Sequence, residues 1–300
     1  MFTRLMLALL ALTFAVATAF GQSTVLGILE DVPGVYAGDP NFRGVRVVFQ
    51  KNGIDWQAFP SACPDQGCLE TLPAQFPREV IWTIAFHGRN LGQITGRTPK
   101  EFTFYSHVGL QEIKGSDPVP TVGKRSPEYG GFADGVVYRP LVANSRPFIK
   151  DPESWEPAQL SAEFVRLLRQ EFRRVYPKLC KTSKNDETKL EPFLYRDEEV
   201  RVVKAYASKR GWAIAELHLE GAIDCGDLEA GSEIDDKWFT VDPQKSVQNL
   251  GEGMLLVDAG DYDNDGKSEL VFSIARYNRG GYELFYDDFK KHATFEFQYH

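Results

Sequence analysis

The residues best suited to chemistry lie in one acidic stretch, Asp261-Tyr262-Asp263-Asn264-Asp265-Gly266-Lys267-Ser268-Glu269. Carboxylates at alternate positions can converge when the backbone curls, and calcium is a hard cation that takes six to eight oxygen ligands. Gly266 permits the sharp turn, and Lys267 can offer its backbone carbonyl while its side chain points to solvent. The spacing therefore predicts a calcium site, with these expected ligands: Asp261, Asp263, Asp265, the Lys267 carbonyl and Glu269.

The residues around this stretch exclude an EF-hand. Its twelfth position would be Phe272, where an EF-hand needs a bidentate glutamate. Leu255–Val257 before the loop and Leu270–Ile274 after it are apolar runs typical of strands. The loop therefore joins two strands, and its ion is expected to stabilise the fold. A solvated acidic turn without an ion is the alternative.

A strand, then Asp-x-Asp-x-Asp-Gly-x-x-Glu, then Leu-Val-Phe resembles the FG-GAP repeat, also called VCBS, of integrin-α-like β-propellers. The resemblance covers about Met254 to Phe285, roughly a tenth of the chain. It implies a calcium loop with the ligands named above and a propeller-like arrangement of sheets. Members of this family usually carry several such repeats, whereas this sequence contains one.

Charge and missing motifs limit the remaining function classes. The chain of 300 residues has 34 Lys+Arg and 42 Asp+Glu, a net charge of −8, which disfavours nucleic acid and anionic lipid as partners. Three motifs are absent: Gly-x-Ser-x-Gly, His-Glu-x-x-His and Gly-x-x-x-x-Gly-Lys. No catalytic residue is therefore expected. Glu233, Asp235 and Asp236 could form an acid/base pair acting on a glycan or a charged hairpin tip.

The N-terminus has the pattern of an export signal. Arg4 precedes an apolar run that ends in small residues at Gly21, so residues 1–21 are expected to be a cleaved signal peptide with no stable membrane insertion afterwards. An oxidising compartment favours disulfides, and we expect the pairs Cys63–Cys68 and Cys180–Cys225. The polar stretch Lys181–Glu191 is then expected to be a loop tethered by the second bridge.

Most of the remaining chain alternates with period two, as strands do. Three hairpins are expected around Asn52-Gly53, around His87-Gly88 and between Val200–Tyr206 and Trp212–Leu219. In the last of these strands one face is apolar. The opposite face carries Glu216, His218 and Glu220, and is expected to be wet.

One amphipathic helix is expected from Pro157 to Tyr176. Proline suits a first helical turn, and Pro177 would end the helix. The apolar residues recur at helical spacing and are expected to form its buried stripe: Leu160, Phe164, Leu167, Leu168, Phe172 and Val175.

Together these patterns predict a mainly β domain over residues 22–300, with a helix at about 157–176 and a calcium loop at 261–269. We expect a small or irregular β-propeller-like architecture, with a β-sandwich as the alternative. The predicted function is a secreted or periplasmic, calcium-stabilised binding or scaffolding protein whose partner is an extracytoplasmic protein or a glycan. The alternative function is a secreted hydrolase acting on glycan or another extracytoplasmic polymer.

Overall fold

A computed structural model describes residues 23–32, 42–61, 71–99, 107–115, 118–129, 136–147, 150–184, 186–225, 236–276 and 279–298. In these residues the chain is mainly β, as predicted, with several antiparallel sheets and one α-helix. The expected signal peptide, Cys63 and Cys68 lie outside the described residues, as do Glu233 and Asp235. No helix among the described residues is long and apolar enough to cross a membrane.

The first sheet, here called the N-terminal sheet, contains seven strands. Its order is β3-β2-β1-β7-β4-β5, and β6 also pairs with β2. The strands are β1 (Val25–Val32), β2 (Phe42–Asn52), β3 (Asp55–Ala58), β4 (Val80–Phe86), β5 (Arg89–Gly96), β6 (Leu110–Glu112) and β7 (Leu141–Asn144). Both predicted hairpins are confirmed: Gly53 and Ile54 form the turn between β2 and β3, and His87 and Gly88 form the turn between β4 and β5.

The second sheet, the middle sheet, contains the last four strands in sequence order. They are β16 (Met254–Gly260), β17 (Glu269–Arg276), β18 (Arg279–Tyr286) and β19 (Lys291–Gln298). Neighbouring residues of β17 enter different cores: Val271 packs towards the N-terminal sheet and Phe272 towards the third sheet. A strand with both faces buried explains the uninterrupted apolar run after the acidic loop.

The third sheet, the helix-backed sheet, has the order β15-β14-β12-β11-β8. Its strands are β8 (Glu156–Pro157), β11 (Arg201–Ala207), β12 (Ala213–His218), β14 (Lys237–Val241) and β15 (Val247–Glu252). The β11–β12 hairpin is confirmed. The expectation of a wet face is wrong for Glu216, which is buried and forms an ion pair with Lys204, because the middle sheet covers the face that would otherwise meet water.

The helix α2 (Ala162–Val175) covers the other face of this sheet. All six residues of the predicted apolar stripe belong to the core between helix and sheet. The helix begins later than expected, because Pro157 pairs with Tyr206 as part of β8. The side chain of Ser161 instead accepts a hydrogen bond from the Phe164 nitrogen and forms the N-cap.

The remaining elements are small. A three-stranded sheet has the order β10-β9-β13, with β9 (Leu179–Ser183), β10 (Asp186–Pro192) and β13 (Ile223–Asp224). The expectation of a loop over Lys181–Glu191 is therefore wrong, since this stretch forms a hairpin. The Cys180–Cys225 disulfide is confirmed, with its Cα atoms 5.1 Å apart. The described residues also include the 3-10 turns η1 (Leu72–Gln75), η3 (Pro127–Tyr129) and η4 (Asp197–Glu199).

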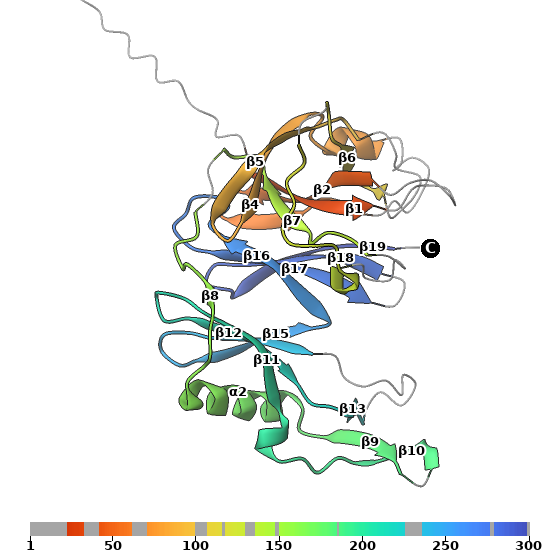
Figure 1. Cartoon of the computed structure of the whole chain (residues 1–300), viewed down its shortest axis with the longest axis vertical. Helices are drawn as coiled ribbons and strands as arrows, with labels where there is room; N and C mark the ends of the chain where they lie inside the picture. Colours follow the sequence, from red (N-terminus) through yellow and green to blue (C-terminus); the bar gives the residue numbers. More distant parts are fainter. Residues whose placement is uncertain are drawn as a thin grey trace, which may run out of the picture.

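The three larger sheets and α2 lie in successive layers, with the middle sheet between the other two (Figure 1). One hydrophobic core fills each gap between layers. No sheet of the described residues closes into a barrel. Of the two architectures that the sequence left open, this layered arrangement has the character of a β-sandwich.

Candidate metal centre

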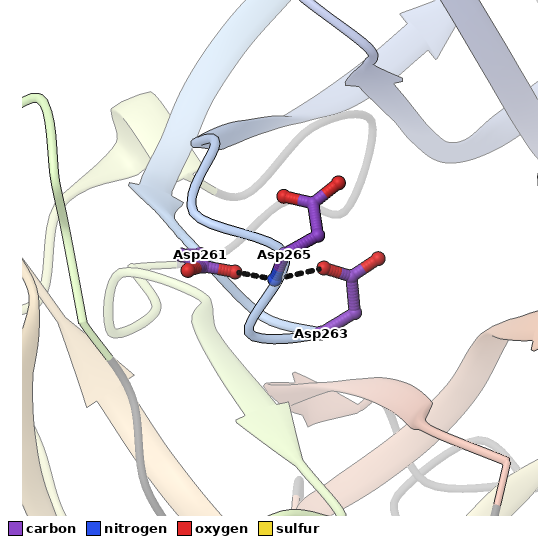
Figure 2. A group of neighbouring side chains, drawn as sticks. All are labelled: Asp261, Asp263 and Asp265. Carbon is purple, nitrogen blue, oxygen red and sulfur yellow. Dashed lines mark hydrogen bonds between the residues drawn. The ribbon is translucent and has the colours of Figure 1, made fainter. Parts of the chain in front are cut away.

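The acidic loop, residues 261–269, connects β16 to β17 as the sequence predicted. It curls tightly because Asn264 (φ 63°) and Gly266 (φ 89°) both adopt left-handed backbone conformations. Glycine adopts this conformation without cost and asparagine tolerates it better than most residues. The turn brings the carboxylates of Asp261, Asp263 and Asp265 to neighbouring positions around the backbone (Figure 2).

One carboxylate oxygen from each of these three residues lies within 4.8 Å of the other two. Two ligands on opposite sides of a calcium ion, each at 2.3–2.6 Å, are separated by about 5 Å. The spacing thus matches a shared cation. Asp261 is 4 % exposed and the Asp263 side chain 5 %, whereas Asp265 is exposed. The group therefore extends from the protein interior to the surface.

The same carboxylates hold the loop in shape. Asp261 accepts hydrogen bonds from the backbone nitrogens of Asp265 (3.0 Å) and Gly266 (2.9 Å). Asp263 also accepts from the Asp265 nitrogen (3.1 Å), which lies between the two carboxylates in Figure 2. Asp265 in turn accepts from the Lys267 nitrogen (2.8 Å). The three carboxylates thus already accept hydrogen bonds from the backbone of the loop.

The other two predicted ligands are placed differently. Glu269 is 1 % exposed, lies outside the group of three, and accepts a hydrogen bond from the Tyr262 nitrogen (2.8 Å). Lys267 directs its side chain away from the loop and forms ion pairs with Asp287 and Asp288 (2.9 Å each). The expectation that this lysine side chain points only to solvent is therefore wrong, since the β18–β19 turn provides two carboxylates within its reach.

Burial makes the negative charge of the loop costly. It raises the pKa of Asp261. The hydrogen bond from the Gly266 nitrogen lowers this pKa, and the charges of Asp263 and Asp265 raise it further. Burial also raises the pKa of Glu269 well above its usual value, and the three aspartates contribute to the shift. A bound cation would lower both costs. The donors are all hard oxygens, so the residues present fit calcium better than a soft transition metal.

One protein cation already reaches this cluster. Lys51, from β2 of the N-terminal sheet, forms an ion pair with Asp263. Its ammonium group also lies 5.3 Å from the centre of the Trp56 ring. Lys51 neutralises part of the charge and would compete with a metal ion for Asp263. No local sequence pattern predicts this pairing, because the two residues lie on distant segments.

Hydrogen bonds connect the loop to the N-terminal sheet, to the β11–β12 turn of the helix-backed sheet and to Lys150 and Asp151. Asn144 of β7 donates to the Tyr262 carbonyl (2.7 Å), and Arg210 of the β11–β12 turn donates to the Gly266 carbonyl (3.2 Å). The Asp261 nitrogen donates to the Lys150 carbonyl (2.6 Å), and Ser268 donates to Asp151 (2.9 Å). An ion that rigidifies the loop would therefore act on the contacts between layers.

A further acid, Asp258, lies on β16 just before the loop. It is buried, and it accepts hydrogen bonds from the His87 nitrogen (2.9 Å) and the Tyr262 hydroxyl (3.0 Å). Burial raises the pKa of Asp258 to about 6. Asp258 was not among the predicted site residues, although an aspartate that follows Leu255–Val257 in an apolar strand was a usable signal.

Comparison with known proteins assigns the chain to no family: no family model, no curated protein and no solved structure matches it.

Proposed function

We propose that the protein is a calcium-stabilised binding or scaffolding protein, with the acidic loop as its calcium site. The convergence of Asp261, Asp263 and Asp265 on a volume of calcium size carries this proposal. The largely buried charge of the loop and its hydrogen bonds to the two neighbouring sheets support a structural role for the ion. In this role calcium holds layers together and takes no part in chemistry.

We also propose a repeat family for the loop and a cellular location for the protein. The motif and its placement between two antiparallel strands support an FG-GAP/VCBS-like repeat. The Cys180–Cys225 disulfide supports a secreted or periplasmic location, because such bonds persist in oxidising compartments. Extracellular calcium is abundant enough to occupy sites with dissociation constants of about 10⁻⁴–10⁻³ M. The partner of such a protein is an extracytoplasmic protein or a glycan.

A thermal-shift measurement tests the structural role. With a dissociation constant of about 0.1 mM, about 1 mM calcium adds about 1.4 kcal/mol to the free energy of unfolding. For a chain of this size the melting temperature rises by about 2–4 °C. Magnesium should raise it less, because magnesium demands a tight octahedron and keeps its waters.

Matched variants identify the ligands. Asp265→Ala should remove the calcium-dependent shift, and by relieving carboxylate repulsion it should not lower the melting temperature of the calcium-free protein. Lys267→Ala should retain the shift, because only the backbone carbonyl of Lys267 is expected to bind. Equal calcium-dependent shifts in the wild type and Asp265→Ala would count against the site.

A further inference from the structure

The ammonium group of Lys51 is enclosed where the N-terminal sheet meets the acidic loop. Lys51 lies on β2 directly opposite Trp56 of β3, and its backbone nitrogen donates to the Thr24 carbonyl (2.8 Å). Its side chain is 15 % exposed. The ammonium nitrogen lies 5.3 Å from the centre of the Trp56 ring and 5.7 Å from that of Tyr286 on β18. Two buried rings and the carboxylate of Asp263 are thus the neighbours of this charge.

Asp263 uses its two carboxylate oxygens in different ways. Its Oδ1 accepts the hydrogen bond from the Asp265 nitrogen within the loop, whereas its Oδ2 forms the ion pair with Lys51. The Asp263 side chain is 5 % exposed, so water and salt screen this ion pair less than they screen ion pairs on the surface. Lys51 therefore supplies one positive charge to a loop that is rich in carboxylates.

A calcium ion bound to Asp263 would lie close to this ammonium group. With an N–O distance of about 2.8 Å and a Ca–O distance of about 2.4 Å, two cations on one carboxylate are separated by about 5 Å. Like charges at that separation repel strongly where water is scarce. Lys51 pairs with one carboxylate, whereas calcium would gain oxygens from three aspartates, so the repulsion favours departure of the ammonium group. The Trp56 and Tyr286 rings still attract a cation after it has left Asp263.

We propose that Lys51 is a built-in counterion of the acidic loop, which pairs with Asp263 in the calcium-free protein and gives it up to calcium. The exchange keeps calcium affinity below that of an unopposed loop and transmits calcium occupancy to β2 and β3. The inference rests on the calcium site proposed above and adds a regulatory residue to it.

Melting temperatures in EDTA and in about 1 mM calcium test the exchange. Lys51→Met lacks the charge, and it should melt below the wild type in EDTA because the buried Asp263 carboxylate loses its counterion. From a dissociation constant of about 0.1 mM, binding about three to ten times tighter should enlarge the calcium-dependent shift to about 1.4–1.9 times that of the wild type. Lys51→Arg retains the charge and should keep the wild-type shift. Lys267→Met, which alters the pair with Asp287, is the matched control and should also keep it.

A second measurement follows Lys51 in the wild-type protein and so does not depend on the folding of Lys51→Met. Ring currents from Trp56 and Tyr286 should separate the Cε–H signal of Lys51 from those of other lysines, and its absence in Lys51→Arg assigns it. This signal should move saturably as calcium is added. It should not move in Asp265→Ala, which retains the Lys51–Asp263 pair but lacks one expected calcium ligand.

Two results would overturn the proposal: a Lys51 signal that is unchanged at saturating calcium, or equal calcium-dependent shifts in Lys51→Met and the wild type. The second result would identify a lysine that only ties two sheets together. If Lys51→Met does not fold, the Lys51 signal decides. Calorimetry of the wild type separates this failure from that of the calcium site. Calcium binding together with either result refutes the counterion alone, and absence of calcium binding refutes both proposals.

Discussion

Two acid-rich turns lie close together in the middle sheet and differ in how their charge is balanced. In the acidic loop, Asp261 and Glu269 are buried and Lys51 is paired with Asp263. In the β18–β19 turn, Asp287 and Asp288 are more exposed and share Lys267, while Lys291 lies 3.7 Å from Asp287. Burial raises the pKa of Asp261, whereas the hydrogen bond from Lys267 lowers the pKa of Asp287.

The difference shows that a count of acidic residues does not identify an ion site. The β18–β19 turn is balanced by lysines, and its left-handed residues Asp287, Asp288 and Phe289 place the Phe289 ring in the core beside Trp155 and Trp212. Its role is to pack an aromatic side chain. In the acidic loop Asp261 and Glu269 are buried and carry no ion pair with a lysine among the described residues, so an added cation has more to stabilise there.

The largest expected effect is a difference in stability between variants of the two turns. Asp261→Ala removes the acceptor of two backbone nitrogens and should lower the free energy of unfolding by about 2 kcal/mol or more, with loss of the calcium response. Asp288→Ala, its control in the β18–β19 turn, loses a solvent-accessible ion pair and should change stability by about 0.5 kcal/mol or less. Urea unfolding with and without calcium measures both. Equal losses in the two variants would remove the distinction.

The second expected effect is a pH dependence of stability. Its sign is opposite for Asp258, beside the acidic loop, and Asp287, in the β18–β19 turn. In the folded protein the pKa of Asp258 is raised from 3.8 to about 6. Its favourable contribution to the free energy of unfolding is therefore fully present below the unfolded-state pKa and is lost as pH rises towards 6. The stability of Asp258→Asn relative to wild type should therefore increase between pH 4 and 7, by up to about 3 kcal/mol.

Asp287→Asn is the matched control for that experiment. The pKa of Asp287 is lowered, so its contribution is present at neutral pH and is lost as pH falls through the folded-state pKa. Its variant should become less stable relative to wild type between low and neutral pH, the reverse of Asp258→Asn. Urea midpoints across the pH range decide the signs, and the same sign for both variants would contradict the contrast.

The smallest effect compares two lysines. Lys51→Met removes the ammonium group paired with Asp263 and should tighten calcium binding about three- to tenfold, because the ion no longer displaces a competing charge. Lys267→Met removes a lysine that pairs with the β18–β19 turn and should leave calcium affinity within about twofold. Calcium titrations of the two variants provide the measurement. Weaker binding in Lys51→Met would show that this lysine supports the site.

Local signals in the sequence predicted local structure well. Asn52-Gly53 predicted a hairpin because the turn needs a residue with positive φ, and Gly53 has φ 62°. The apolar stripe of α2 predicted its buried face. The start of the helix was wrong because a proline fits both a first helical turn and an edge strand, and only pairing with Tyr206 decides between them.

Contacts between distant segments account for what the sequence did not reveal. The closeness of the three aspartates follows from the curl of one loop, so it could be predicted from the sequence. The approach of Lys51, Asn144 and Arg210 depends on how three sheets stack, which no local pattern encodes.

The most direct test of calcium binding by the acidic loop is isothermal titration calorimetry on the chelator-stripped, folded protein. We predict a single calcium site with a dissociation constant of about 0.1–1 mM. Binding should be lost in Asp263→Ala and retained in Asp288→Ala, which alters only the β18–β19 turn. Absence of binding at millimolar calcium in the folded wild type, or undiminished binding in Asp263→Ala, would contradict the account.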